Sequence, residues 1–151
     1  MDRLCSLRMT TEFNTSQSAL LTSLKERGVR PTRQRTAAYE CILTKRDHPT
    51  ADDILSRVRH KLPTISFATV YNCLETLLSC GLVRQVNFDR APSRYCPNLS
   101  PHAHFKCDKT GEIYDLELNE SLVHSIKNAL PPGFVAENFD LTFNGSHLSQ
   151  N

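Results

Sequence analysis

The stretch SFATVYNCLETLLSCGLVRQVNFDRAPSRYC, residues 66–96, decides the fold. Its first half places apolar side chains at the i, i+4, i+7 and i+8 positions of a helix, namely Val70, Leu74, Leu77 and Leu78. Ser66 is a candidate N-cap, and Gly81 is a typical helix stop. Beyond Gly81, LVRQVNF and SRYC are typical of two short strands joined by the turn DRAP. The pattern predicts a helix followed directly by a β-hairpin.

Further helices are predicted upstream of this stretch. SALLTSLKERG has a leucine face, PTRQRTAAYECILTKRDHP has Thr32 as an N-cap, and TADDILSRVRHKLP begins with a capping box of Thr50 and Asp53. Three or four helices followed by a two-stranded ribbon is the order of a winged helix-turn-helix, whose last helix enters the DNA major groove. We therefore expect a winged-helix DNA-binding domain over residues 17–96 and a flexible N-terminal tail over residues 1–16.

The C-terminal third predicts a second, smaller unit. Two prolines mark residues 97–101 as a hinge. HAHFKC and EIYDLE flank the turn DKTG as a hairpin, NESLVHSIKNAL has a helical apolar stripe, and NFDLTFNG alternates like a half-buried strand. Residues 102–151 are therefore expected to form a small α/β domain for dimerisation and metal sensing, because about fifty residues bury little surface alone. The predicted fold class is α+β.

Composition and charge indicate a globular protein whose first domain binds a polyanion. A hydrophobic content of 39% and a charged content of 23% are those of a globular protein, and no apolar run approaches the length of a membrane span. Six cysteines without an export signal favour reduced thiols or metal ligands in the cytoplasm. Residues 1–101 hold 15 Lys and Arg against 9 Asp and Glu, a net +6, whereas residues 102–151 hold 3 against 7, a net −4. This asymmetry favours a polyanionic partner for the first domain only.

The helix that begins after Ser66 is the candidate DNA-contacting element. A polar face on an isolated helix would by itself be an ordinary solvated surface. The predicted wing behind this helix, the basic first domain and the arginines ahead of it together favour DNA binding. The candidate DNA-binding residues are Arg33, Arg35, Ser66, Thr69, Tyr71 and Asn72.

Metal-binding side chains gather in residues 96–115. His102 and His104 project to the same face of a strand, and a four-residue turn at DKTG would place Asp115 directly opposite His104. Cys96 is a further candidate ligand, as is His48, although on local sequence alone His48 is an ordinary polar loop residue. If both bind the ion, metal occupancy would set the angle between the two domains.

The motifs GVRPTRQR, HPTADDI, SFATVYNCLETLLSCGLV, SRY and HAHFKCDKTGEIYDL, in this order, resemble the ferric uptake regulator (Fur) family over residues 18–145. The resemblance implies a dimeric, metal-responsive DNA-binding repressor with a winged-helix domain and a small α/β dimerisation domain. It also implies that His48, His102, His104 and Asp115 are regulatory ligands. The remaining family ligand, usually Asp or Glu, falls on Cys96.

Two departures from the family refine this expectation. Tyr71-Asn72 resembles the peroxide-responsive branch. Cys107-x-x-Thr110 has lost one cysteine of the family's structural zinc clasp and no later cysteine exists, so we expect no four-cysteine structural zinc. Asn138 and Phe139 stand where an accessory metal site often has a histidine, which favours one regulatory divalent ion per chain, Zn, Fe or Mn.

The sequence thus predicts a cytoplasmic homodimeric repressor of peroxide-stress or metal-homeostasis genes that binds palindromic double-stranded operator DNA and no membrane. The alternatives are a zinc-uptake-type regulator with Cys96 as a ligand, and a thiol-based redox sensor that uses Cys96. An enzyme whose metal activates water is less favoured, because only Glu112 or Glu117 offers a general base and no substrate pocket is recognisable.

Overall fold

A computed structural model describes residues 17–146 and residue 148, so the predicted N-terminal tail lies outside the described residues. The chain divides into two compact units between Leu99 and Ser100, at a point inside the segment 97–101. Within the described part of the chain, no helix combines the length and the apolar character of a membrane span.

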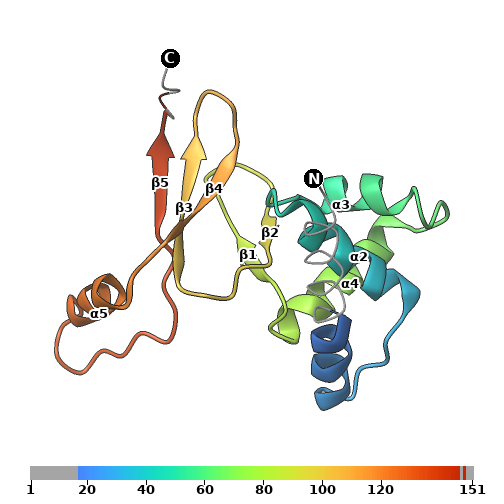
Figure 1. The fold of residues 1–151 in the computed structure, drawn as a ribbon, viewed down its shortest axis with the longest axis horizontal. Coiled ribbons are helices and arrows are strands. Elements are labelled where there is room, and N and C mark those ends of the chain that lie inside the picture. Colours follow the sequence, from blue (N-terminus) through green and yellow to red (C-terminus); the bar gives the residue numbers. More distant parts are fainter. Residues whose placement is uncertain (1–16, 147, 149–151) are drawn as a thin grey trace, which may run out of the picture. The chain divides into compact units, whose positions relative to one another are not determined.

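The first unit contains helices followed by a two-stranded ribbon (Figure 1). Residues 17–26 are helical, and three helices follow: α2 (Arg33–Lys45), α3 (Ala51–Val58) and α4 (Phe67–Ser79). The ribbon consists of β1 (Arg84–Val86) and β2 (Arg94–Cys96), which pair antiparallel with Gln85 opposite Tyr95. The predicted order of a winged helix-turn-helix is confirmed.

Local capping signals set where the helices begin. The side-chain oxygens of Thr32, Thr50 and Ser66 each accept a hydrogen bond from the backbone N–H three residues later. Thr50 and Asp53 complete the predicted capping box, because the Thr50 backbone N–H donates to Asp53 Oδ2 at 2.9 Å. This backbone hydrogen bond is the main reason why the pKa of Asp53 is lowered.

The hydrophobic core of the chain lies in the first unit. It is formed by the inward faces of the helical segment 17–26 and of α2, α3 and α4, closed by residues of the wing. Three of the four predicted apolar positions of α4, Val70, Leu74 and Leu77, are fully buried, whereas Leu78 is only partly buried. This unit therefore has the interior expected of a domain that folds around its own core.

The second unit is a three-stranded sheet with one helix (Figure 1). The strand β3 (His102–Cys107) lies between β4 (Ile113–Glu117), its antiparallel partner, and β5 (Thr142–Gly145), its parallel partner. The helix α5 (Glu120–Asn128) and the loop after it carry the chain from β4 to β5. The last strand is shorter than NFDLTFNG predicts. Its register pairs Thr142 with His104, so residues before 140 lie beyond the end of β3 and have no strand to pair with.

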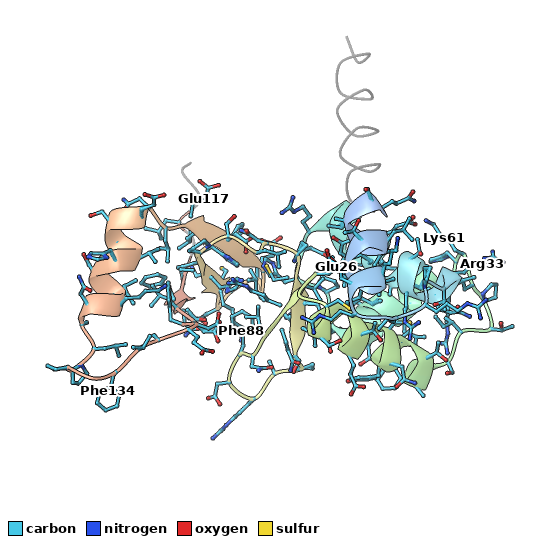
Figure 2. All side chains as sticks on the ribbon, turned by 90° about the horizontal axis from the view of Figure 1, so that it is seen from below. Glu26, Arg33, Lys61, Phe88, Glu117 and Phe134 are labelled. Atoms are coloured by element: carbon cyan, nitrogen blue, oxygen red, sulfur yellow. The ribbon has the colours of Figure 1, made fainter. Side chains whose placement is uncertain are left out.

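The two faces of this sheet differ in chemistry. Register pairs lie on the same face, so His104 and Asp115 share one face, whereas Phe105, Tyr114 and Phe143 share the other. Helix α5 buries none of its residues. Figure 2 shows Phe134 on the loop after α5, projecting outward. The exposed apolar side chains of this unit include Tyr114, Leu116, Leu122, Leu130, Phe134, Val135 and Phe143.

An ion pair joins the end of α2 to α3 in the first unit. Both terminal nitrogens of Arg57 donate to the Asp47 carboxylate, at 2.9 and 2.7 Å, and Lys45 Nζ lies 3.3 Å from the same group. The hydrogen bonds from Arg57, strengthened by those from Lys45, lower the pKa of Asp47 to about 2. Because its folded-state pKa is depressed, Asp47 stabilises the fold above its ordinary titration range, and this contribution is lost as the pH falls from about 4 to about 2.

We predict that Asp47→Asn lowers the free energy of unfolding at neutral pH by about 1–2 kcal/mol, a value reduced for partial solvent screening. The difference from wild type should disappear as the pH approaches 2, where wild-type Asp47 is itself protonated. Urea unfolding of the full chain at several pH values, followed by circular dichroism, measures both effects. Asp89→Asn, at an exposed turn position, is the matched control. A deficit that did not shrink with falling pH would show that the carboxylate charge is not the cause.

Candidate metal centre

The second unit brings His102, His104 and Asp115 together. Alternation along β3 places both imidazoles on one face, and the predicted register of His104 opposite Asp115 is confirmed. The Nε2 atoms of the two histidines lie 3.0 Å apart, and Asp115 Oδ1 lies 3.7 Å from the first and 3.5 Å from the second. Two nitrogen donors and one carboxylate oxygen therefore converge on one point.

The ring orientation of His102 suits a metal ligand. Its Nδ1 lies 2.7 Å from the backbone carbonyl of Ser100, which can only accept a hydrogen bond. A hydrogen bond to this carbonyl engages Nδ1, which leaves Nε2 as the ring nitrogen that faces His104 and Asp115. A backbone carbonyl in this role is a common way of orienting a metal-bound imidazole. The donor set fits a divalent cation.

The first unit supplies a second group of candidate ligands. His48 is 2% exposed and Cys96 is 0% exposed. One ligand atom of His48 lies within 4.8 Å of the Cys96 sulfur. His48 has a positive backbone φ of 54°, a conformation that costs free energy in a residue with a side chain.

Contacts with β2 hold His48 in this position. The Arg94 guanidinium donates to the His48 carbonyl at 2.9 Å, and the Tyr95 backbone N–H donates to the Pro49 carbonyl at 3.1 Å. An isolated antiparallel bridge pairs Thr50 with Arg94. These contacts place the loop before α3 beside the strand that ends at Cys96. Sequence analysis missed Arg94, whose only signal was its place in the motif SRYC.

Among the residues that the structure describes, no cysteine other than Cys96 belongs to a group of potential metal ligands. Cys107 is the only cysteine of the second unit. Its backbone N–H donates to the Glu112 carbonyl across the hairpin, and the next N–H, of Asp108, donates to the Gly145 carbonyl at the end of β5. Burial raises the pKa of the Cys41 and Cys73 thiols, which therefore stay protonated at neutral pH.

The predicted DNA-contacting side chains lie in the first unit. Ser66, Tyr71 and Asn72 are exposed at the N-terminal half of α4, whereas Thr69 is half-buried. The hydroxyls of Ser66 and Thr69 lie 2.8 Å apart, and the Ser66 oxygen also caps the helix, so both take part in the start of α4.

Both arginines predicted to contact DNA lie in the first turn of α2. Arg33 is exposed in the first turn, at the edge of the unit (Figure 2). Arg35 is half-buried, and its guanidinium donates to the Arg30 carbonyl, so it also holds the loop before α2.

Residues 26–144 match the sequence profile of the Ferric uptake regulator family. The chain belongs to this family. The Peroxide operon regulator of Bacillus subtilis is 43% identical to it over 95 residues, which are 63% of this chain and 66% of that regulator. The Peroxide-responsive repressor PerR of Staphylococcus epidermidis is 38% identical over 95 residues, 63% of each chain. The chain thus spans just under two thirds of the length of these two relatives.

The fold agrees with that assignment. The crystal structure of the Campylobacter jejuni peroxide stress regulator matches with a TM-score of 0.68 and 28% sequence identity, over 87% of this chain and 98% of that one. Together with the strand and helix order of the two units, this match confirms the predicted α+β class.

We predict that this member of the family folds without a structural zinc ion. After treatment with a strong chelator, metal analysis should find no zinc, while the helical circular dichroism signal should persist, because the second unit has no other cysteine to clasp an ion with Cys107. Cys107→Ala should behave like wild type before and after chelation. Collapse of the helical signal on chelation would contradict the prediction, since loss of a regulatory ion removes only its binding free energy.

Proposed function

We propose that the chain is a cytoplasmic, homodimeric repressor of transcription that responds to a divalent metal ion, in the control of peroxide stress or metal homeostasis. One ion per chain permits binding to a palindromic operator duplex. The proposed metal ligands are His48, Cys96, His102, His104 and Asp115. The observation that carries the proposal is the presence of two incomplete ligand groups, one on each unit of the chain.

Neither ligand group suffices by itself. The second unit offers two imidazole nitrogens and a carboxylate oxygen, and the first offers one imidazole and one thiolate. A zinc ion takes four such ligands, and Fe(II) or Mn(II) takes five or six. An ion that uses ligands from both groups ties the two units together, so its binding free energy favours one arrangement of them.

The ligand chemistry bears on the metal. Thiolate is a soft ligand that favours Zn(II), whereas two histidines with a carboxylate also suit Fe(II) and Mn(II). The relatives named above are peroxide regulators, which favours peroxide-linked control for this chain as well. A zinc-uptake-type regulator is the second candidate function, and the position of Cys96 beside His48 is the observation that favours it.

Burial of Cys96 supports a ligand role over that of a thiol redox sensor. Redox-sensing cysteines are accessible thiolates in electropositive surroundings. Cys96 is 0% exposed, and a candidate metal ligand, His48, is its neighbour.

An enzyme with a metal-activated water is less well supported. Of the two carboxylates considered as its general base, Glu112 accepts hydrogen bonds from Thr110 and Tyr114 near the hairpin turn. The other, Glu117, is the register partner of His102. The relatives are named as regulators and a repressor.

The first unit has the features of a DNA-binding domain. Helix α4 presents exposed polar and aromatic residues, the β1–β2 ribbon follows it as a wing, and the first 101 residues carry a net charge of +6. Lysine and arginine contacts with phosphates would supply salt-dependent affinity, and α4 would select the sequence. The proposed contact residues are Arg33, Arg35, Ser66, Thr69, Tyr71 and Asn72.

A second copy of the chain fits the apolar surface of the second unit. The hydrophobic core cluster lies wholly in the first unit. On the sheet face of the second unit, Tyr114 and Phe143 are exposed on either side of the half-buried Phe105. Exposed apolar surface of this extent favours a protein interface. A twofold dimer presents two α4 helices to successive half-sites, which is why a palindromic operator is expected.

The central prediction is that ligands from both units are needed for metal-dependent DNA binding. A duplex is first selected from a random library with the wild-type protein in the presence of Zn(II), Mn(II) or Fe(II). Fluorescence anisotropy with this duplex should then show that His48→Ala and His104→Ala each weaken metal affinity by roughly tenfold or more. Both variants should also lose the metal-dependent gain in DNA affinity, because the ion can no longer join the two groups.

The matched controls are His60→Ala in the first unit and His124→Ala in the second, both exposed histidines outside the ligand groups. They should behave like wild type. Full metal response in His48→Ala together with its loss in His104→Ala would show that the ion is held by the second unit alone. Equal DNA affinity of wild type with and without metal would overturn the proposed function.

Cobalt substitution tests the role of Cys96. We expect Co(II)-loaded wild type to show a near-ultraviolet thiolate-to-cobalt charge-transfer band, because the sulfur bonds directly to the ion. Cys96→Ser should lose this band, and Cys107→Ala should retain it. Co(II) bound at the histidine site of wild type without the band would exclude Cys96 as a ligand.

A further inference from the structure

An exposed aromatic pair stands at the N-terminal end of α4. Phe67 is the first residue of the helix and is 42% exposed, and Tyr71 lies one turn later and is 41% exposed. Their ring centroids are 4.6 Å apart at an interplanar angle of 67°, an edge-to-face arrangement. In the described part of the first unit, no other aromatic side chain of α4 or elsewhere is as exposed.

The position of Phe67 is that of a base-contacting residue. In helix-turn-helix proteins, residues at the N-terminal end of the recognition helix contact base edges in the major groove. Phe67 directly follows the N-cap Ser66. On its other side Ala68 is small and exposed, so the Phe67 ring is not covered by its neighbour in the helix.

The chemistry of the ring limits what it can recognise. Phenylalanine has no hydrogen-bond donor or acceptor, unlike Tyr71 and Asn72, so it cannot pair with the polar groups of a base edge. The one apolar group that bases present in the major groove is the C5-methyl of thymine. Contact between the ring and this methyl group removes apolar surface of both from water.

We propose that Phe67 is a specificity residue that contacts a thymine methyl group in each operator half-site, and that it does so directly rather than by supporting Tyr71. This inference rests on the DNA-binding function proposed above. It assigns the exposed Phe67 ring to thymine and leaves hydrogen bonding to Tyr71 and Asn72.

Replacement of thymine by deoxyuridine tests the proposal, because it removes only the methyl group. The probe is the duplex selected with metal-loaded wild type, resynthesised with one deoxyuridine at a time at symmetric positions. Wild type should lose affinity about fourfold at one thymine per half-site, the factor expected for one buried methyl-sized group. Phe67→Ala should bind the thymine and deoxyuridine duplexes equally at that position, and Phe67→Leu should retain part of the preference.

Two further variants separate the direct contact from its alternatives. Tyr71→Ala should leave the methyl preference assigned to Phe67 in place, because the proposal gives the contact with the methyl group to the Phe67 ring itself, one helical turn before Tyr71. Leu21→Ala, which removes an exposed apolar side chain from the helical segment 17–26, should leave this preference unchanged. Circular dichroism of each variant checks that the helices remain folded.

The outcomes distinguish this inference from the function on which it rests. If no duplex is enriched with metal-loaded protein, the proposed repressor function fails and the inference fails with it. If a duplex is enriched but wild type binds every deoxyuridine probe as well as the parent, or if Phe67→Ala keeps the wild-type pattern, only the Phe67 inference is overturned. Loss of the same methyl preference in Phe67→Ala and Tyr71→Ala would show that Phe67 merely supports Tyr71.

Discussion

The contact between β2 and the loop before α3 is the interaction on which the rest of the first unit's chemistry depends. Arg94 and Tyr95 donate hydrogen bonds to the carbonyls of His48 and Pro49, and these bonds fix a loop in which His48 has a positive φ. The same loop provides the capping box of α3 one residue after Pro49. One set of backbone contacts therefore anchors the wing, begins a core helix and places an imidazole beside the Cys96 thiol.

The two units differ in how they bury their apolar side chains. The first buries leucines and isoleucines of its helices in one continuous core. The second has too few elements to enclose an interior, and its sheet instead uses each face separately. On one face, His102, His104 and Asp115 lie close together. The other face holds Phe105, Tyr114 and Phe143, which a partner could bury. A metal ion and a second copy of the chain are the partners proposed for these two faces.

Sequence analysis succeeded where the determining forces are local. The N-caps Thr32, Thr50 and Ser66 follow from short-range hydrogen bonding, and the pairing of His104 with Asp115 follows from the length of the DKTG turn. It could not place His48, because the contact that holds it comes from Arg94, 46 residues later. It also predicted too long a last strand, since the extent of a parallel strand depends on where its distant partner begins.

Through Cys96, the proposed metal ion would affect the DNA-binding wing as well as the arrangement of the two units. It is the last residue of β2 and pairs in register with Arg84, the first residue of β1, so it belongs to the wing itself. A carboxylate at this position would bind the ion through a longer and more flexible side chain, whereas the sulfur of a thiolate ligand is attached directly to Cβ. An ion held by Cys96 and His48 would therefore restrain the base of the wing as well as the loop before α3. In the proposed function, metal binding would thus order the wing of each DNA-binding unit at the same time as it sets the orientation of that unit in the dimer.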